Sequence, residues 1–299
     1  MSEENLQAAE KVDTGFSESW LALREPADHL ARNKTIDKQL FAWFAQQESH
    51  SILELGAGTG SNLRYLMPQL GRAQNWRLLD NDAALFARLP ELLRSWAEAN
   101  GARFSGNDTQ CKIEHADYSA TVEWQVVDLA TQLETLSMDN VKLVTAAALL
   151  DLTSASWLDK LAALVSMHRC ACLFTLNYNG EIQWQPEADT DRHVTALLNR
   201  HQLMDKGFGP ALGPEAGHYL KQALQRLGRN VVTGDSDWVI EPQTTELQMA
   251  IIEGWTPAAQ ETDNHAADSI RQWHAVRENA INKGLSTLLV GHTDVLSLP

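Results

Sequence analysis

Three glycines and two acidic residues in the first third of the chain have the clearest chemical use. Gly56, Gly58 and Gly60 follow the apolar run Ile52-Leu53-Glu54-Leu55, and a helical pattern comes directly after them. Glycine lets a backbone turn sharply and approach a ligand that any Cβ would obstruct. We therefore expect residues 56–60, called the glycine loop below, to hold a small molecule.

Carboxylates stand at the ends of both strands that this pattern predicts. Glu54 lies two positions before Gly56, and Asp80 closes a second apolar run, Trp76-Arg-Leu-Leu-Asp80, twenty residues after Gly60. A carboxylate at the tip of the second strand can accept hydrogen bonds from both hydroxyls of a ribose. Together with the glycine loop, Asp80 predicts a nucleoside site.

The stretch Glu54-Leu-Gly-Ala-Gly-Thr-Gly60, taken with Asp80, resembles the cofactor signature of the class I S-adenosylmethionine-dependent methyltransferases. A nicotinamide enzyme of Rossmann type would more usually lack the Glu54 carboxylate and would place its third glycine at Ser61. The resemblance implies S-adenosyl-L-methionine as cofactor and S-adenosyl-L-homocysteine as product. Two alternatives stay open: a regulatory protein of the same fold that binds the cofactor without catalysis, and a nicotinamide-dependent enzyme.

The resemblance also assigns cofactor contacts. The helices before the first strand offer Arg24, Asp28, Arg32 and Asn33, of which an arginine, with Arg32 in the predicted set, would hold the methionine carboxylate. Asp80 would hold the ribose, and Asp128 the adenine amino group. The competing interpretations are a solvated helix charge for Arg32 and a helix cap for Asp128. The complete predicted set is Arg32, Glu54, Gly56, Ala57, Gly58, Thr59, Gly60, Asn62, Asp80, Asn81, Asp128, Leu129, Thr145 and Ala146.

The periodicity of the whole chain fits one α/β fold. We expect a Rossmann-like seven-stranded sheet in the order 3-2-1-4-5-7-6, flanked by helices, with an N-terminal helical cap and helical insertions. Residues 1–50 would form a tail and the cap, residues 51–180 the cofactor-binding core, and residues 181–299 a lid or acceptor insert with the last helices and strands of the same sheet. The motif resemblance covers residues 51–180, and the remainder resembles the family in topology only.

The methyl acceptor is harder to predict. Tyr178 follows the expected fifth strand, and His201, Asp205 and Lys206 lie in a helix and Gly/Pro-rich bend that we interpret as a lid. If the acceptor must lose a proton, His201 is the first candidate for the base and Asp151 the second. Tyr178, Asp205 and Lys206 are the candidates for substrate binding, although a turn or a structural role fits each of them as well.

The composition of the chain indicates which classes of binding partner to expect. The formal charge of −15 disfavours phosphate backbones and anionic membranes, so we expect a small-molecule acceptor rather than nucleic acid or a membrane. The acidic, polar start of the chain lacks a secretion signal, and three cysteines do not make a disulfide framework, so we expect a cytoplasmic protein with reduced thiols. No Cys/His cluster has zinc spacing, so no metal is expected. The oligomeric state is left open.

Overall fold

Five parallel strands form the centre of the sheet in the computed structural model, which describes residues 16–299. In spatial order they are β5 (Tyr118–Val126), β2 (Arg72–Asp80), β1 (Ser51–Leu55), β6 (Val141–Ala147) and β7 (Ala171–Gln185). β1 and β6 are buried along most of their length, as expected of parallel strands covered on both faces. The tail expected before Ser17 falls largely on residues 1–15, outside the described part.

Antiparallel strands complete the sheet at both ends. β10 (Thr287–Leu298) pairs with β7 and carries β8 (Asn230–Asp235) and β9 (Trp238–Ile240) on its other side. The order β5-β2-β1-β6-β7-β10-β8 is the expected 3-2-1-4-5-7-6, so the Rossmann-like fold is confirmed. The expected strand number was wrong: a hairpin of β3 (Arg103–Gly106) and β4 (Gln110–Glu114) extends the β5 edge, and the sheet has ten strands.

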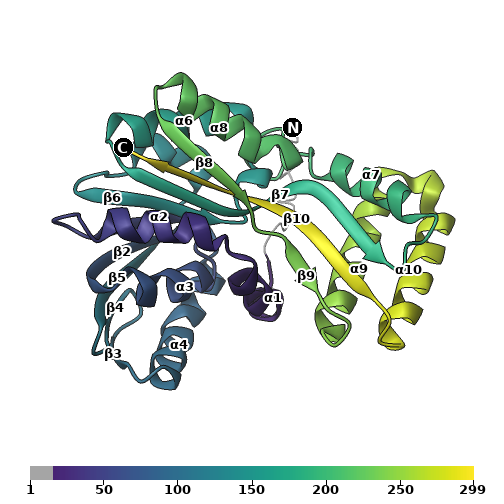
Figure 1. The fold of residues 1–299 in the computed structure, drawn as a ribbon, viewed down its shortest axis with the longest axis horizontal. Helices are drawn as coiled ribbons and strands as arrows, with labels where there is room; N and C mark the ends of the chain where they lie inside the picture. Colours follow the sequence, from purple (N-terminus) through teal and green to yellow (C-terminus); the bar gives the residue numbers. More distant parts are fainter. Residues whose placement is uncertain (1–15) are drawn as a thin grey trace, which may run out of the picture.

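Helices cover both faces of the sheet (Figure 1). One face carries α2 (Lys34–Phe44), α3 (Ser61–Leu70) and α4 (Ala83–Ala99), and the other carries α5 (Leu129–Gln132), α6 (Ala155–Met167) and α8 (Ala216–Arg226). Each of these faces has its own apolar core, with Trp76 and Phe44 on the first and Trp157 and Phe174 on the second. The carboxyl ends of β1, β2 and β6 therefore lie between two rigid layers.

The strands β7 and β10 continue well beyond the rest of the sheet (Figure 1). The sequence predicts that the fifth strand ends near Leu176, but β7 runs on to Gln185 because β10 pairs with it over this length. Three further helices, α7 (Asp191–His201), α9 (Thr245–Thr262) and α10 (Ala267–Asn282), pack on this extension around Trp184 and Trp273. Tyr178 is thus a strand residue and not part of a turn.

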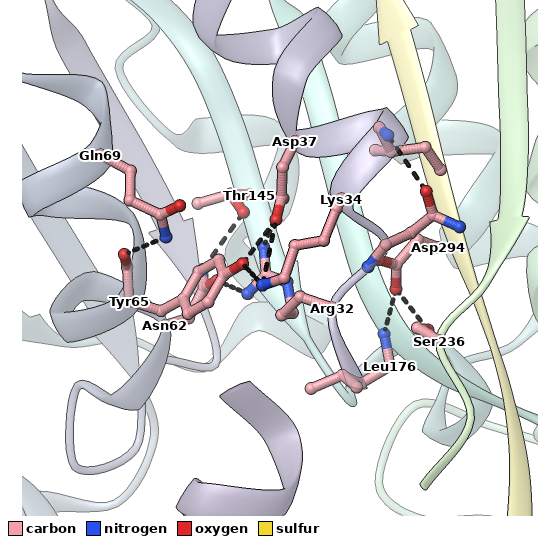
Figure 2. Close-up of polar contacts among 12 residues, drawn as sticks. Arg32, Lys34, Asp37, Asn62, Tyr65, Gln69, Thr145, Leu176, Ser236 and Asp294 are labelled. Atoms are coloured by element: carbon pink, nitrogen blue, oxygen red, sulfur yellow. Dashed lines mark hydrogen bonds and ion pairs between the residues drawn. The ribbon is translucent and has the colours of Figure 1, made fainter. Parts of the chain in front are cut away.

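The N-terminal cap consists of α1 (Glu18–Ala31) and α2, joined at Asn33. Asp294 of β10 holds this junction, because its carboxylate accepts hydrogen bonds from the Asn33 and Leu176 backbone N–H groups and from the Ser236 hydroxyl (Figure 2). These bonds tie the cap to the sheet, so the position of α1 over the carboxyl ends of the strands is fixed from its C-terminal end. Among residues 16–299, no helix combines the length and apolarity that crossing a bilayer requires.

Candidate functional site

The glycine loop leaves β1 in a conformation that suits glycine. Gly56, Gly58 and Gly60 have φ values of +63°, +51° and +79°, in the left-handed region where a Cβ is strained. The Ala57 N–H donates to the Leu79 carbonyl oxygen of β2 at 3.1 Å, which fixes the loop against the neighbouring strand. The loop therefore bends at the carboxyl edge of the sheet, where ligands bind in open α/β folds.

Asp80, at the end of β2, faces the glycine loop. One carboxylate oxygen accepts the Gly58 N–H at 2.7 Å and the other accepts the Asp82 N–H at 2.9 Å. Burial raises the pKa of Asp80, while these two backbone bonds act in the opposite direction. Each oxygen keeps a free lone pair, so the carboxylate can accept further hydrogen bonds from a diol.

Arg32, at the C-terminal end of α1, reaches the N-terminus of α3. Its Nη1 donates to Asn62 Oδ1 at 2.7 Å, and Asn62 Nδ2 in turn donates to Thr145 Oγ1 at 3.2 Å. Figure 2 shows Arg32 beside Asn62 and Tyr65, and its guanidinium carbon lies 4.3 Å from the centre of the Tyr65 ring. Gly60 caps α3 without a side-chain hydrogen bond, so this helix end also favours an anionic group.

The hydrogen bonds of Arg32 are incomplete, although the residue is only 3% exposed. Within the described chain Nε and Nη2 have no hydrogen-bond partner, and Nη2 has only a 3.9 Å ion-pair contact with Asp37. Arg277, the comparably buried arginine of α10, donates from all three guanidinium nitrogens to Asp191 and to the Pro186 carbonyl oxygen. Because buried donors are nearly always paired, the free donors of Arg32 point to a ligand with acceptor oxygens.

Glu54, the last polar residue of β1, offers a free hydrogen-bond acceptor near the free donors of Arg32. It is 1% exposed, and Oε2 lacks a hydrogen-bond partner among residues 16–299. Burial raises its pKa to about 8, and a hydrogen bond to Asn62 and the charges of Arg32 and Arg64 only partly offset this effect. A cationic group beside Glu54 would restore the ionised carboxylate. Arg32, Asn62 and Glu54 therefore present free donors and a free acceptor side by side.

The residues expected near adenine lie at the ends of β2 and β5. Asn81 is exposed, while Leu129 is buried and its carbonyl oxygen accepts from the Trp157 indole at 2.8 Å. Asp128 is exposed and caps α5, accepting from the Ala130 N–H and the Thr131 hydroxyl, both at 3.0 Å. The helix-cap interpretation of Asp128 is thus correct, and its contact with adenine stays a prediction. Thr59 of the loop and Thr145 and Ala146 of β6 are all buried.

The acceptor candidates fall into two groups. His201, at the end of α7, contacts Glu261 at 3.1 Å and Lys206 at 3.4 Å, and the Asp205 carboxylate accepts the Gly207 and Gly209 N–H groups of its own turn. No hydrogen bond or ion pair in the described chain joins these three residues to the glycine loop. Asp151 lies instead in the turn that follows the carboxyl end of β6, and Tyr178 lies within β7.

The segment interpreted as a lid partly reaches this edge. Its Gly/Pro-rich part packs beside the turn that contains Asp151, where the Leu212 N–H donates to the Thr153 carbonyl oxygen at 2.9 Å. The Phe208 ring lies 5.3 Å from the Trp157 ring. The segment therefore supports the rim of the site through its backbone and apolar side chains.

The glycine loop is covered in this conformation. A Cβ built on Gly58 would lie 3.3 Å from Leu21 Cδ1 of α1, and one on Gly56 would lie 3.3 Å from Leu149 Cδ1. Two surface hollows of about 380 and 330 Å³ are both on the β7 side, lined by residues such as Asn199 and Arg192, and neither includes a glycine-loop residue. A ligand seated over Gly58 must therefore displace Leu21.

Sequence reasoning noted Arg24 and Asp28 only as polar residues of the cap, and it gave Trp238 and His292 no role in the site. Arg24 and Asp28 of α1 meet Trp238 of β9, and His292 of β10 lies beside Tyr178. Their signal was weak, because His292 lies within a strand that also carries Thr293 and Asp294, and Trp238 lies in what the sequence predicted as one continuous strand. Only the pairing of β9 and β10 brings them to the edge.

Comparison with known proteins gives fold-level likenesses only. No family model matches the sequence, and no curated protein matches it either. Similar solved structures include S-adenosylmethionine-dependent methyltransferases from Thiobacillus denitrificans (13% identity, 95% of this chain and 99% of that one, TM-score 0.43) and Geobacter sulfurreducens (14%, 95% and 98%, 0.45), both in complex with S-adenosyl-L-homocysteine. A cyclopropane-fatty-acyl-phospholipid synthase-like protein from Lactobacillus casei is also similar (15%, 92% and 99%, 0.48). Since every one of these TM-scores is below 0.5, the functional argument rests on the site itself.

Proposed function

We propose that this protein is a methyltransferase that uses S-adenosyl-L-methionine and acts on a small-molecule acceptor. The observation that carries the proposal is the pair of incomplete buried groups, Arg32 and Glu54, on either side of Asn62. An α-amino acid has a carboxylate for the free donors of Arg32 and an ammonium for the free oxygen of Glu54. The methionine end of the cofactor supplies both groups.

The adenosine end of the cofactor fits the neighbouring strands. Asp80 can accept from the ribose hydroxyls, and the positive φ of Gly58 lets the backbone approach the ligand closely. Asn81, Asp128 and Leu129 lie at the ends of β2 and β5, on the same edge. The contacts for the amino-acid end, around Asn62, and those for the adenine end, after β2 and β5, are at different places along this edge. An extended molecule such as the cofactor requires this arrangement.

The sulfonium cofactor, when bound, supplies an already activated methyl group. The protein then has to orient the acceptor behind that group and exclude water, which a closed α1 over the loop would do. Leu21 moves away for entry and returns over the bound ligand. Asp151, at the end of β6, is the described carboxyl group best situated to receive a proton from the acceptor.

Binding and turnover are tested separately. Calorimetry with S-adenosyl-L-methionine, S-adenosyl-L-homocysteine and NAD should give binding of the first two only. A screen of small metabolites with methyl-labelled cofactor should then give a labelled product. Binding without any product would favour a regulatory protein that senses the cofactor, and preference for NAD would overturn the proposal.

A further inference from the structure

A second group of buried and partly buried polar side chains lies after the end of β6, within β7 and β10, and on α1, and the proposed cofactor contacts do not use it. It consists of Asp151, Tyr178 and His292 on the sheet and of Arg24 and Asp28 on α1, with Trp238 beside them, and is called the second cluster below. Its members come from five elements far apart in the sequence. A ligand is one reason for a fold to gather them.

Asp28 is fully engaged within the second cluster. Arg24 donates to both of its carboxylate oxygens, at 3.0 and 3.1 Å, and the Trp238 indole N–H donates to one of them at 3.0 Å. The Arg24 guanidinium carbon lies 4.9 Å from the centre of the Trp238 ring. The charges of Arg24 and Asp28 therefore cancel, and the pair binds α1 to β9.

Asp151 and His292 each leave one polar side-chain atom without a partner. They are 8% and 5% exposed, and Asp151 Oδ1 and His292 Nδ1 have no hydrogen-bond partner in the chain from residue 16 onward. Burial raises the pKa of Asp151 to about 6, and burial with the charge of Arg24 lowers the pKa of His292 to about 3. At neutral pH the cluster thus has one uncompensated negative charge, on Asp151, and a neutral imidazole.

Sequence neighbours of two members of the second cluster lie against the glycine loop. Leu149, two residues before Asp151, contacts Gly56, and Leu21, less than one helical turn before Arg24, contacts Gly58. The His292 ring lies 6.4 Å from the Tyr178 ring and 5.2 Å from the Trp238 ring. A molecule bound here would have an aromatic surface on one side and the cofactor's loop on the other.

We propose that the second cluster binds the methyl acceptor and that this acceptor is a small cationic amine, an inference that rests on the proposed methyltransferase function. The Asp151 carboxylate takes a proton from the ammonium group, and His292 Nδ1 accepts a hydrogen bond from a second N–H. The amine lone pair then forms the N–C bond as the C–S bond breaks, and the bonding electrons stay on sulfur. The methylated amine and S-adenosyl-L-homocysteine leave, and Asp151 returns its proton to water.

Charge and acidity favour an amine over other acceptors. A cation balances the uncompensated carboxylate, whereas an anionic acceptor would meet Asp151 and also Asp237, whose Oδ1 accepts the His292 backbone N–H at 2.8 Å. An ammonium group of pKa about 10 can lose its proton to a weak base, and an aliphatic alcohol is far less acidic. The Trp238 and Tyr178 rings suit the apolar or cationic part of such a molecule.

The test uses the full chain with four variants. Asp151→Asn and His292→Gln remove the two free groups, and Asp159→Asn and His218→Gln make the same changes at exposed positions of α6 and α8. Transfer of labelled methyl is measured for primary and secondary amines, phenols, alcohols and carboxylates. Calorimetry measures the binding of S-adenosyl-L-homocysteine to the wild type. A second titration adds the best amine to the wild type saturated with S-adenosyl-L-homocysteine, so the binding of each ligand is measured without relying on a variant.

The inference expects methylation of amines, a fall in kcat of about 100-fold or more for Asp151→Asn, and a rise in amine KM of about tenfold for His292→Gln. The affinity for S-adenosyl-L-homocysteine and the melting temperature should stay close to those of the wild type, as should all values for the two exposed variants. Wild type that binds S-adenosyl-L-homocysteine but methylates only hydroxyl or carboxylate acceptors would overturn this inference alone. Full turnover in Asp151→Asn would do the same, whereas wild type that binds no adenosine compound would overturn the proposed function itself.

Discussion

Replacing Arg32 by glutamine should weaken the binding of S-adenosyl-L-homocysteine selectively. The structure leaves two donors of this buried guanidinium free, and hydrogen bonds to a charged partner are worth about 1.5–3 kcal/mol. The dissociation constant should therefore rise about 10- to 150-fold. Calorimetry measures it directly, and the same titration with 5′-methylthioadenosine, which lacks the amino-acid end, should change by less than about threefold.

The comparison of the two ligands separates recognition from folding. Arg32 also bonds Asn62 and stacks on Tyr65, so Arg32→Gln will lower the melting temperature and could weaken both ligands equally through damage to the loop. Arg277→Gln is the matched control, because it removes an equally buried arginine from the distant helices of the β7–β10 extension. Equal losses for both ligands, or no loss for either, would refute the assignment of Arg32 to the carboxylate.

Four further outcomes follow from the same geometry. Burial raises the pKa of Glu54 from 4.5 to about 8. The unfolding free energy of the ligand-free protein, measured in urea titrations, should therefore fall relative to that of Glu54→Gln as pH rises from about 5 to about 8. The same dependence of unfolding free energy on pH in both proteins would contradict this. Binding of the cofactor's ammonium should ionise Glu54, so calorimetry at pH about 7 in buffers of different ionisation enthalpy should detect proton release that Glu54→Gln abolishes. Gly58→Ala should cost about 1–2 kcal/mol of unfolding free energy, because φ is +51° and Leu21 is adjacent; unchanged stability would mean that the loop relaxes. Asp80→Asn should weaken S-adenosyl-L-homocysteine and 5′-methylthioadenosine alike, by about tenfold or more in calorimetry, since both contain the ribose. Selective loss of one ligand would argue against a ribose contact.

The central strands could be predicted because their signals are local. An apolar run before Gly56 and another ending at Asp80 specify β1 and β2 whatever lies elsewhere, and the helical pattern after each fixes α3 and α4. The length of β7 could not be predicted in this way. Its second half is half-exposed and polar in sequence, and it is a strand only because β10, about a hundred residues later, pairs with it.

The residues of the candidate site likewise divide into those on neighbouring elements, which could be predicted, and those joined by distant pairings, which could not. The glycine loop, Glu54 and Asp80 lie on consecutive elements, so their proximity follows from two parallel neighbours. The contact of Arg32 with Asn62 depends on how the cap crosses the sheet, and the sequence indicated only that a cap arginine was available. His292 and Trp238 depend on the register of β9, β10 and β7, which no short pattern encodes. Residues brought together by distant pairings therefore needed the structure.

Within four turns, the helix α1 and its C-cap contact the glycine loop, the second cluster and the N-terminus of α3. Leu21 lies over Gly58, Arg24 and Asp28 belong to the second cluster, and Arg32 reaches Asn62, while Asp294 holds the far end of the helix at Asn33. Because these contacts lie on one helix, a movement of α1 that admits one ligand also disturbs the contacts around the other. The two ligands should consequently be coupled, so that saturating the nucleoside site slows the dissociation of the amine.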